Sequence, residues 1–62
     1  MKKFRRWLKA SGLSQRDAGR KLGIGQMAVS YYVTGKGLPS IRAAYLIEKG
    51  TRGAVRLRDW IK

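Results

Sequence analysis

The sequence predicts an all-α fold, a compact domain of four to five short helices, and three observations support this prediction. Apolar residues recur at three- and four-residue spacing, which places them on one face of a helix. Glycine and serine stand between these stretches, where they can end one helix and begin the next. The 62 residues suffice for one modest core and show no linker or internal repeat. We therefore expect residues 1–62 to form a single domain.

Residues 2–10 predict a strongly amphipathic first helix. Phe4, Trp7 and Leu8 lie at positions i, i+3 and i+4, and lysine and arginine occupy the remaining surface. Gly12 follows at a position suited to ending this helix, because a glycine adopts the left-handed conformation at low cost. The spacing therefore gives this helix one apolar side and one basic side.

Residues 14–34 predict two short helices that are joined by a tight turn. Ser14 can cap the start of the first helix, and Gly23 can end it. Gly19 carries almost no side chain, which allows the backbones to approach closely where the helices cross. The two helices are expected over residues 15–22 and 26–33, with Ala18, Leu22, Ala28, Val29 and Tyr32 facing the core. This arrangement is typical of a helix-turn-helix, whose second helix enters the DNA major groove.

Ser40 predicts the start of a fourth helix over residues 41–49, which Gly50 closes. We expect this helix to turn Ile41, Ala44, Tyr45 and either Leu46 or Ile47 toward the core.

The pattern of residues 54–61 is compatible with either a short fifth helix or a short strand. Leu57, Trp60 and Ile61 have helical spacing, whereas Val55 and Leu57 alternate with arginines as a strand would. The alternation fails at Asp59, which would point inward in a strand. The helix is therefore favoured.

The composition favours a polyanionic partner and argues against an enzyme. Fifteen Lys and Arg face three acidic residues, which gives a net charge of +12. The chain has no Cys and no His, so it lacks disulfides, thiol nucleophiles, imidazole bases and the usual zinc ligands. The acids Asp17, Glu48 and Asp59 are expected to be surface ion-pair partners, with Asp17 paired to Lys21. We expect no catalytic residue, no metal and no cofactor.

The outward side of the 26–33 helix is neutral and can form hydrogen bonds. We expect base contacts from Gln26, Met27, Ser30, Tyr31 and Thr34. Glutamine can pair with adenine, serine can donate or accept, and methionine can touch a thymine methyl group. An ordinary solvated helix on this basic chain would be expected to carry Lys or Arg here.

Phosphate contacts are expected from residues around this helix. Gln15 lies at the start of the preceding helix, where free N–H groups can hold a phosphate. The expected set is Gln15, Arg16, Lys36, Lys2, Lys3 and Arg6.

The central pattern resembles the Cro- and lambda-repressor-like helix-turn-helix family. The matching residues are Ser14-Gln15-x-x-Ala18-Gly19-x-x-Leu22-Gly23-Ile24-Gly25-Gln26-x-Ala28-Val29-Ser30-x-Tyr32. The later stretch Ile47-Glu48-Lys49-Gly50-Thr51-Arg52-Gly53-Ala54-Val55 is similar to phage Cro proteins and YdaS-type regulators. The resemblance implies a lambda-repressor-like domain that binds operator DNA as a symmetric dimer and represses transcription. It also implies a base-contacting role at Gln26, Met27, Ser30 and Tyr31.

Three positions depart from the family pattern. Gly25 stands where a capping serine is common, Ala18 replaces a larger leucine, and Tyr32 stands where tryptophan is frequent.

These observations predict a sequence-specific regulator of double-stranded DNA, in particular a Cro-like phage or prophage repressor. Residues 26–34 would enter the major groove of an operator, and the chain would form a homodimer at least on DNA. We expect it in the bacterial host cytoplasm, associated with the nucleoid, with no small-molecule substrate and no membrane partner. The alternative is a cationic amphipathic peptide that binds membranes or polyanions through residues 2–10. RNA binding is a weaker third option.

Overall fold

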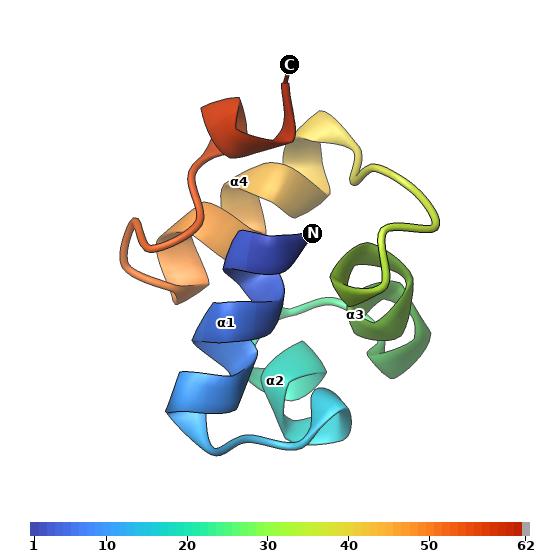
Figure 1. Ribbon diagram of the computed structural model, residues 1–62, viewed down its shortest axis with the longest axis vertical. Helices are drawn as coiled ribbons and strands as arrows, with labels where there is room; N and C mark the ends of the chain where they lie inside the picture. Colours follow the sequence, from blue (N-terminus) through green and yellow to red (C-terminus); the bar gives the residue numbers. More distant parts are fainter. Residues whose placement is uncertain (62) are drawn as a thin grey trace.

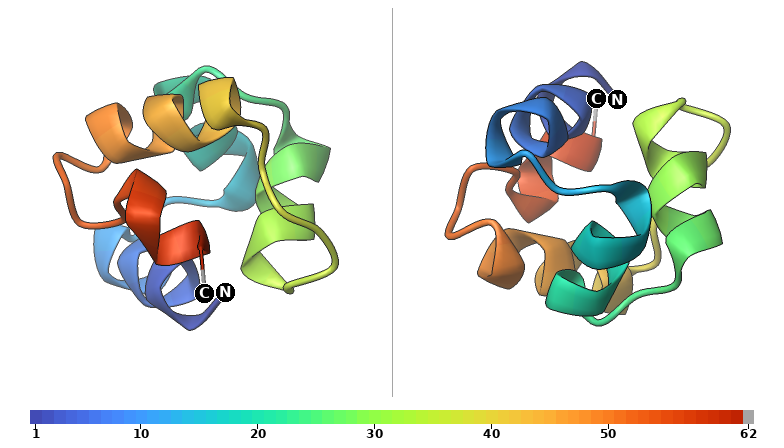
Figure 2. Two further views of the ribbon diagram at one scale, coloured as in Figure 1. Left: turned by 90° about the horizontal axis from the view of Figure 1, so that it is seen from above. Right: turned by 90° about the horizontal axis from the view of Figure 1, so that it is seen from below.

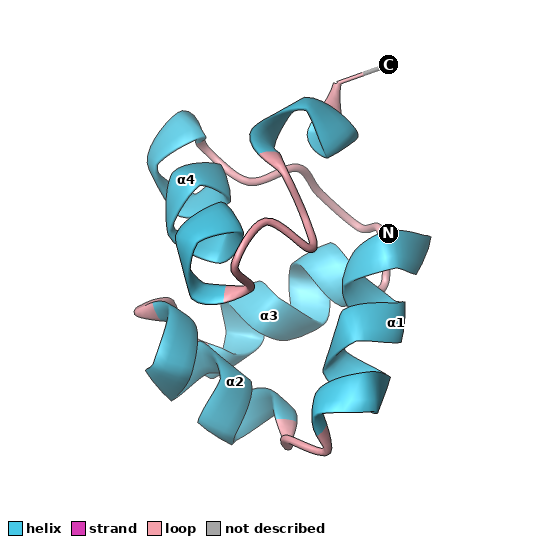
Figure 3. Cartoon of the chain, turned by 90° about the vertical axis from the view of Figure 1, so that its left-hand side faces the viewer, coloured by secondary structure: helices cyan, strands magenta, loops and turns pink. Residues whose placement is uncertain are grey.

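The computed structural model describes residues 1–61, and its elements are all helical (Figure 1). The elements are α1 (Lys2–Ser11), α2 (Gln15–Leu22), α3 (Gln26–Val33), α4 (Ile41–Gly50) and the 3-10 helix η1 (Leu57–Trp60). No strand occurs within the described residues, as the colouring of Figure 3 shows. The prediction of an all-α domain of four to five helices is confirmed.

Local capping explains where the helices begin and end. Ser14 and Ser40 precede α2 and α4, and their hydroxyls accept backbone N–H groups at 3.1 and 3.2 Å. Gly12 and Gly23 follow α1 and α2 with φ of 73° and 81°, the left-handed region that glycine adopts readily. The bounds of α2 and α3 agree with the prediction. Helix α4 continues one residue further, so that Thr51 rather than Gly50 is its C-cap.

The core lies between α1, α2, α3 and α4. Its fully buried centre is made of Phe4, Val29, Ile47 and Val55. Ala18, Leu22, Val33, Ala44 and Trp60 complete the set of buried apolar side chains. Of the stripe predicted on α3, Val29 is buried and Ala28 and Tyr32 are half-buried, and Val33, one turn after Val29, is buried as well.

Three aromatic rings from distant parts of the chain meet in the core, and we call them the aromatic cluster. Trp60 of η1 meets Phe4 of α1 edge-on, with ring centroids 6.0 Å apart, and meets Tyr32 of α3 at 5.9 Å. Figure 2 shows η1 beside α1 in both views. The aromatic cluster thus joins the first, third and last helices.

The prediction for the core side of α4 was partly wrong. Ile41 is 79% exposed and Tyr45 is 57% exposed, whereas Ala44 and Ile47 are buried. Apolar residues occur on every side of this helix, so spacing alone does not identify the side that packs inward.

The tail forms a 3-10 turn over Leu57–Trp60, as the helical interpretation predicted, and the strand alternative was wrong. Two carboxylates fix its start: Asp59 accepts the Arg56 N–H at 2.7 Å, and Glu48 of α4 accepts the Leu57 N–H at 2.8 Å. Of the three apolar residues with helical spacing, only Trp60 is buried, and Ile61 is 70% exposed.

Candidate nucleic-acid interface

The outward side of α3 carries the side chains predicted to contact bases. Gln26 and Thr34 are exposed, Met27 is 85% exposed, Tyr31 is 52% exposed, and Ser30 is half-buried. The helix contains no charged residue. The Thr34 hydroxyl donates to the Ser30 carbonyl at 2.8 Å, so this hydroxyl offers a DNA base mainly its acceptor lone pairs. The result is a neutral surface of amide, hydroxyl and thioether groups.

The opposite side of α3 is held in the interior. Val29 is fully buried, Val33 is buried, and Tyr32 packs on Trp60. Tyr31 and Tyr32 therefore divide as expected, with Tyr31 outside and Tyr32 against the core. This packing fixes the rotation of α3 about its axis, and so it determines which residues face outward.

Close packing at the turn fixes the position of α3 relative to α2. A Cβ atom at Gly19 would lie 2.8 Å from the Ile24 carbonyl oxygen and 3.3 Å from the Gln26 nitrogen. The Gly19 carbonyl accepts the N–H groups of both Gly23 and Ile24 at 2.9 Å. The close approach predicted at Gly19 is therefore made with the turn and the start of α3.

The C-terminal end of α3 is joined to the loop that follows and to the start of α1. The N–H groups of Gly35 and Lys36 donate to the carbonyls of Tyr32 and Tyr31 at 3.2 and 3.0 Å. The Met1 ammonium donates to the carbonyls of Tyr32 and Val33, both at 3.0 Å. Figures 1 and 2 show α3 at one edge of the molecule, with the loop continuing along that edge. The first turn of α1 is thereby held beside the last turn of α3.

The predicted phosphate contacts lie on three segments around α3. Gln15 and Arg16 belong to the first turn of α2, and Lys36 belongs to the loop after α3. The other three, Lys2, Lys3 and Arg6, lie on α1. All are exposed except Gln15, which is half-buried. Because α1 runs away from α3 in Figure 1, its first residues are the better placed of its set.

Lys3 has a protein partner as well. Its ammonium pairs with the Asp59 carboxylate at 3.1 Å. The Arg56 backbone N–H lowers the pKa of Asp59, desolvation opposes that shift, and Lys3 lowers the pKa further. Within residues 1–61 this is the one ion pair, so the pairing of Asp17 with Lys21 was wrong. Such surface pairs at i and i+4 contribute a few tenths of a kcal/mol, too little to hold two flexible side chains together.

The apolar side of α1 is occupied by core contacts. Phe4 is fully buried, and the Trp7 ring stacks on it with centroids 5.9 Å apart. This packing removes the apolar side that the membrane-peptide alternative required. Among the residues described, no helix has the length and apolarity to cross a bilayer.

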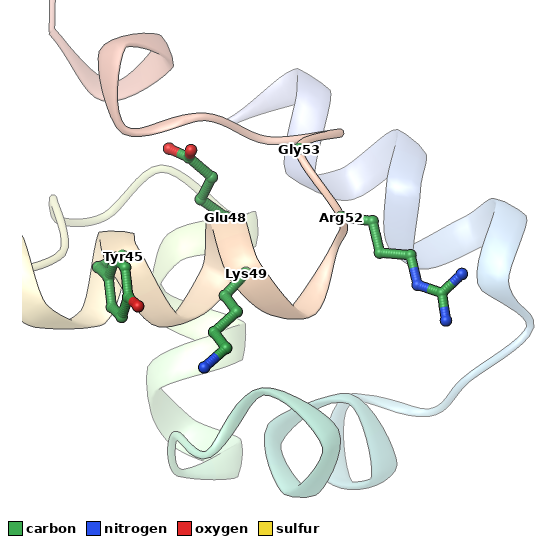
Figure 4. A pocket seen from close by; sticks show the side chains of 5 residues that line it. All are labelled: Tyr45, Glu48, Lys49, Arg52 and Gly53. Carbon is green, nitrogen blue, oxygen red and sulfur yellow. The ribbon is translucent and has the colours of Figure 1, made fainter.

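A hollow of about 380 Å³ lies over α4 and the turn after it. Figure 4 shows its side chains pointing apart: Tyr45 and Lys49 extend to one side, Glu48 to the other, and Arg52 away from all three. Glu48 is already engaged by the Leu57 N–H. These side chains therefore do not converge on a common point.

Two surface features did not emerge from the sequence. The Tyr31 ring lies directly against Gly37. An apolar groove of about 250 Å³ runs between the start of α4 and η1, and its walls are Leu38, Pro39, Ile41, Ala44, Leu57, Trp60 and Ile61. The signal for the groove was the excess of apolar residues on α4, which we assigned to the core.

Comparison with known proteins gives one family match. A family model described as helix-turn-helix matches residues 4–53, which include all of α2, α3 and α4 and most of α1. No curated protein and no solved structure gives a significant match to the chain.

Proposed function

The chain belongs to the helix-turn-helix family of Cro and lambda-repressor-like DNA-binding transcriptional regulators, and from this premise we propose that it is a sequence-specific, Cro-like phage or prophage repressor. In this proposal residues 26–34 enter the major groove of a double-stranded operator. The observation that carries the proposal is the neutral, exposed side of α3 on a chain of net charge +12.

The outward side chains of α3 suit direct reading of bases. Gln26, exposed at the first position of the helix, can pair with an adenine through its amide. Met27, which is 85% exposed, can contact a thymine methyl group. Ser30 and Tyr31 add hydroxyls one turn further along, and Thr34 adds an acceptor at the end of the helix.

The phosphate contacts supply affinity without sequence preference. Gln15 and Arg16 start α2, so a phosphate there would also meet the free N–H groups of the first turn. Lys36, Lys2 and Arg6 would contact the backbone on the other side of α3. Lys3 would have to release Asp59 before it could serve a phosphate, so we rank it last.

We further propose that two copies pair across the apolar groove when both are bound to DNA. The groove exposes large apolar side chains, with Leu38 at 75%, Ile41 at 79% and Ile61 at 70%. Two free copies, each with a charge of +12, repel one another, and DNA phosphates neutralise that repulsion. The proposed setting is the cytoplasm of a bacterial host, on the nucleoid.

Selection of bound duplexes from a random pool tests the proposed function. A preferred sequence should emerge, and gel-shift titrations at two salt concentrations should show a slope of about −0.9 per neutralised phosphate. Gln26→Ala and Ser30→Ala should reduce the preference for that duplex over a scrambled one. Arg6→Ala should weaken both duplexes alike. Equal affinity of the wild-type protein for every duplex would refute sequence-specific repression.

Sedimentation with a duplex that carries two half-sites tests the pairing. Two copies should bind together, and Ile41→Ser should abolish the cooperativity. Tyr45→Ser is the matched control, because Tyr45 is exposed on the same helix but does not line the groove. Independent binding of single copies would refute the dimer.

A further inference from the structure

We infer that Gly37 is a positioning residue for DNA readout: because it has no side chain, the Tyr31 ring can place its Cδ2–Cε2 edge against the loop after α3, and this fixes where the phenol meets DNA. The inference rests on the proposed function, in which Tyr31 is a base contact. Gly37 lies outside α3, in the loop between α3 and α4.

The contact between this loop and the ring is close. A Cβ atom at Gly37 would lie 2.7 Å from Tyr31 Cδ2, closer still to Cε2, and 3.5 Å from Cζ. Carbon atoms in ordinary contact stand about 3.5–4.0 Å apart. Any side chain at position 37 therefore requires the Tyr31 ring to move.

Backbone conformation gives no other reason for glycine at this position. Gly12, Gly23, Gly35 and Gly53 have φ between 73° and 83°, where other residues are strained. Gly37 does not have a positive φ, so its backbone carries no such requirement. The methyl group of an alanine at position 37 would instead clash with the Tyr31 ring.

The ring will yield to a new side chain before the loop does. The loop is held to α3 by the N–H groups of Lys36 and Gly35, which donate to the carbonyls of Tyr31 and Tyr32. The Tyr31 side chain is 52% exposed, so it can rotate into solvent. Gly37→Ala should therefore displace the ring and leave the fold almost unchanged.

The displaced ring changes what the protein recognises. A base contact depends on the position of the side chain to within about 0.5 Å, so a rotated phenol loses its base. The phosphate contacts come from other segments and should be unaffected.

The test compares binding to the duplex that the wild-type protein selects with binding to a scrambled duplex. Gly37→Ala should lower the preference about tenfold, within the range that one good base contact provides. Affinity for the scrambled duplex and the melting temperature should change little. In a Tyr31→Ala background, adding Gly37→Ala should change nothing further. An unchanged preference in Gly37→Ala, or an additive loss in the double variant, would overturn the inference.

Gly35→Ala serves as the stability control, because Gly35 has φ of 78° in the same loop. It should lower the melting temperature, whereas Gly37→Ala should not. A comparable loss of stability in both variants would mean that Gly37 serves the fold rather than the ring, and would overturn the inference.

NMR of the free protein separates this inference from the proposed function. The ring current of Tyr31 should shift the Gly37 α-proton resonances, and Tyr31→Ala should remove that shift. If the resonances do not respond, the contact is absent and the positioning role fails, whatever DNA binding shows. If they respond but the wild-type protein prefers no duplex, the proposed function fails, and the positioning role fails with it.

Discussion

Gly19→Ala tests whether the turn between α2 and α3 sets the position of α3, the helix proposed to read DNA. The new Cβ would lie 2.8 Å from the Ile24 carbonyl oxygen and 3.3 Å from the Gln26 nitrogen. Both are backbone atoms of the turn and of the first residue of α3, so neither can rotate away as a side chain would. The start of α3 must therefore move relative to α2.

Two opposing terms set the expected change in stability. Alanine is favoured over glycine inside a helix by about 1 kcal/mol. Overpacking in a close-packed interior costs about 1–3 kcal/mol. The expected loss is therefore between about 0 and 2 kcal/mol, which lowers the melting temperature of a domain of this size by up to roughly 16 °C, at about 4–8 °C per kcal/mol. The larger effect should appear in the preference between the selected and scrambled duplexes, because α3 carries the proposed base contacts.

Thermal denaturation and gel-shift titration together measure both effects. Gly25→Ala is the control for DNA preference, because Gly25 lies in the same turn and has nothing within 4 Å of an added Cβ. It should keep the preference and lose only some helix capping. A Gly19→Ala protein that is more stable than wild type by the full helix propensity of alanine, and that still prefers the selected duplex over the scrambled one, would refute the reasoning.

Three further predictions concern the fold. Phe4→Ala should leave the chain unfolded at 25 °C by circular dichroism, because it removes a fully buried ring at a cost of about 3–5 kcal/mol. That cost equals the whole free energy of unfolding that a small core provides. A cooperative melt above 40 °C would contradict this. Ser14→Ala should cost about 1 kcal/mol in urea denaturation by removing the cap of α2, and an unchanged midpoint would refute it. The pKa of Asp59 is lowered in the folded protein, below 3.8, so its ionised carboxylate stabilises the fold fully above about pH 4 and loses that effect as the pH falls through the folded pKa. The difference in melting temperature between wild type and Asp59→Asn should therefore disappear in acid. A difference that stays constant with pH would contradict the assignment.

The sequence predicted α2 and α3 well because local interactions determine their ends. Ser14 and Gly23 act on neighbouring backbone groups, and on the polar helix α2 the apolar pair Ala18 and Leu22, four residues apart, points inward as predicted. The neutral side of α3 was predictable for the same reason. Whether its residues contact bases remains a prediction.

The sequence could not predict features that depend on distant segments. On α4 the apolar residues surround the helix, and only packing against α2 and η1 determines that Ile47 lies inside while Ile41 lies outside. The contact between Tyr31 and Gly37 depends on the path of a loop, which neither residue reveals alone. The Lys3–Asp59 pair joins opposite ends of the chain and has no local pattern.

The aromatic cluster has a practical consequence for fragment design. The family match stops at residue 53, yet the fully buried Val55 and the ring of Trp60 lie beyond that point. A fragment trimmed to the matched region would expose Phe4 and Tyr32 to water and would release the support behind α3. A piece that presents α3 in its observed orientation therefore keeps Met1, whose ammonium binds the end of α3, and extends through Trp60.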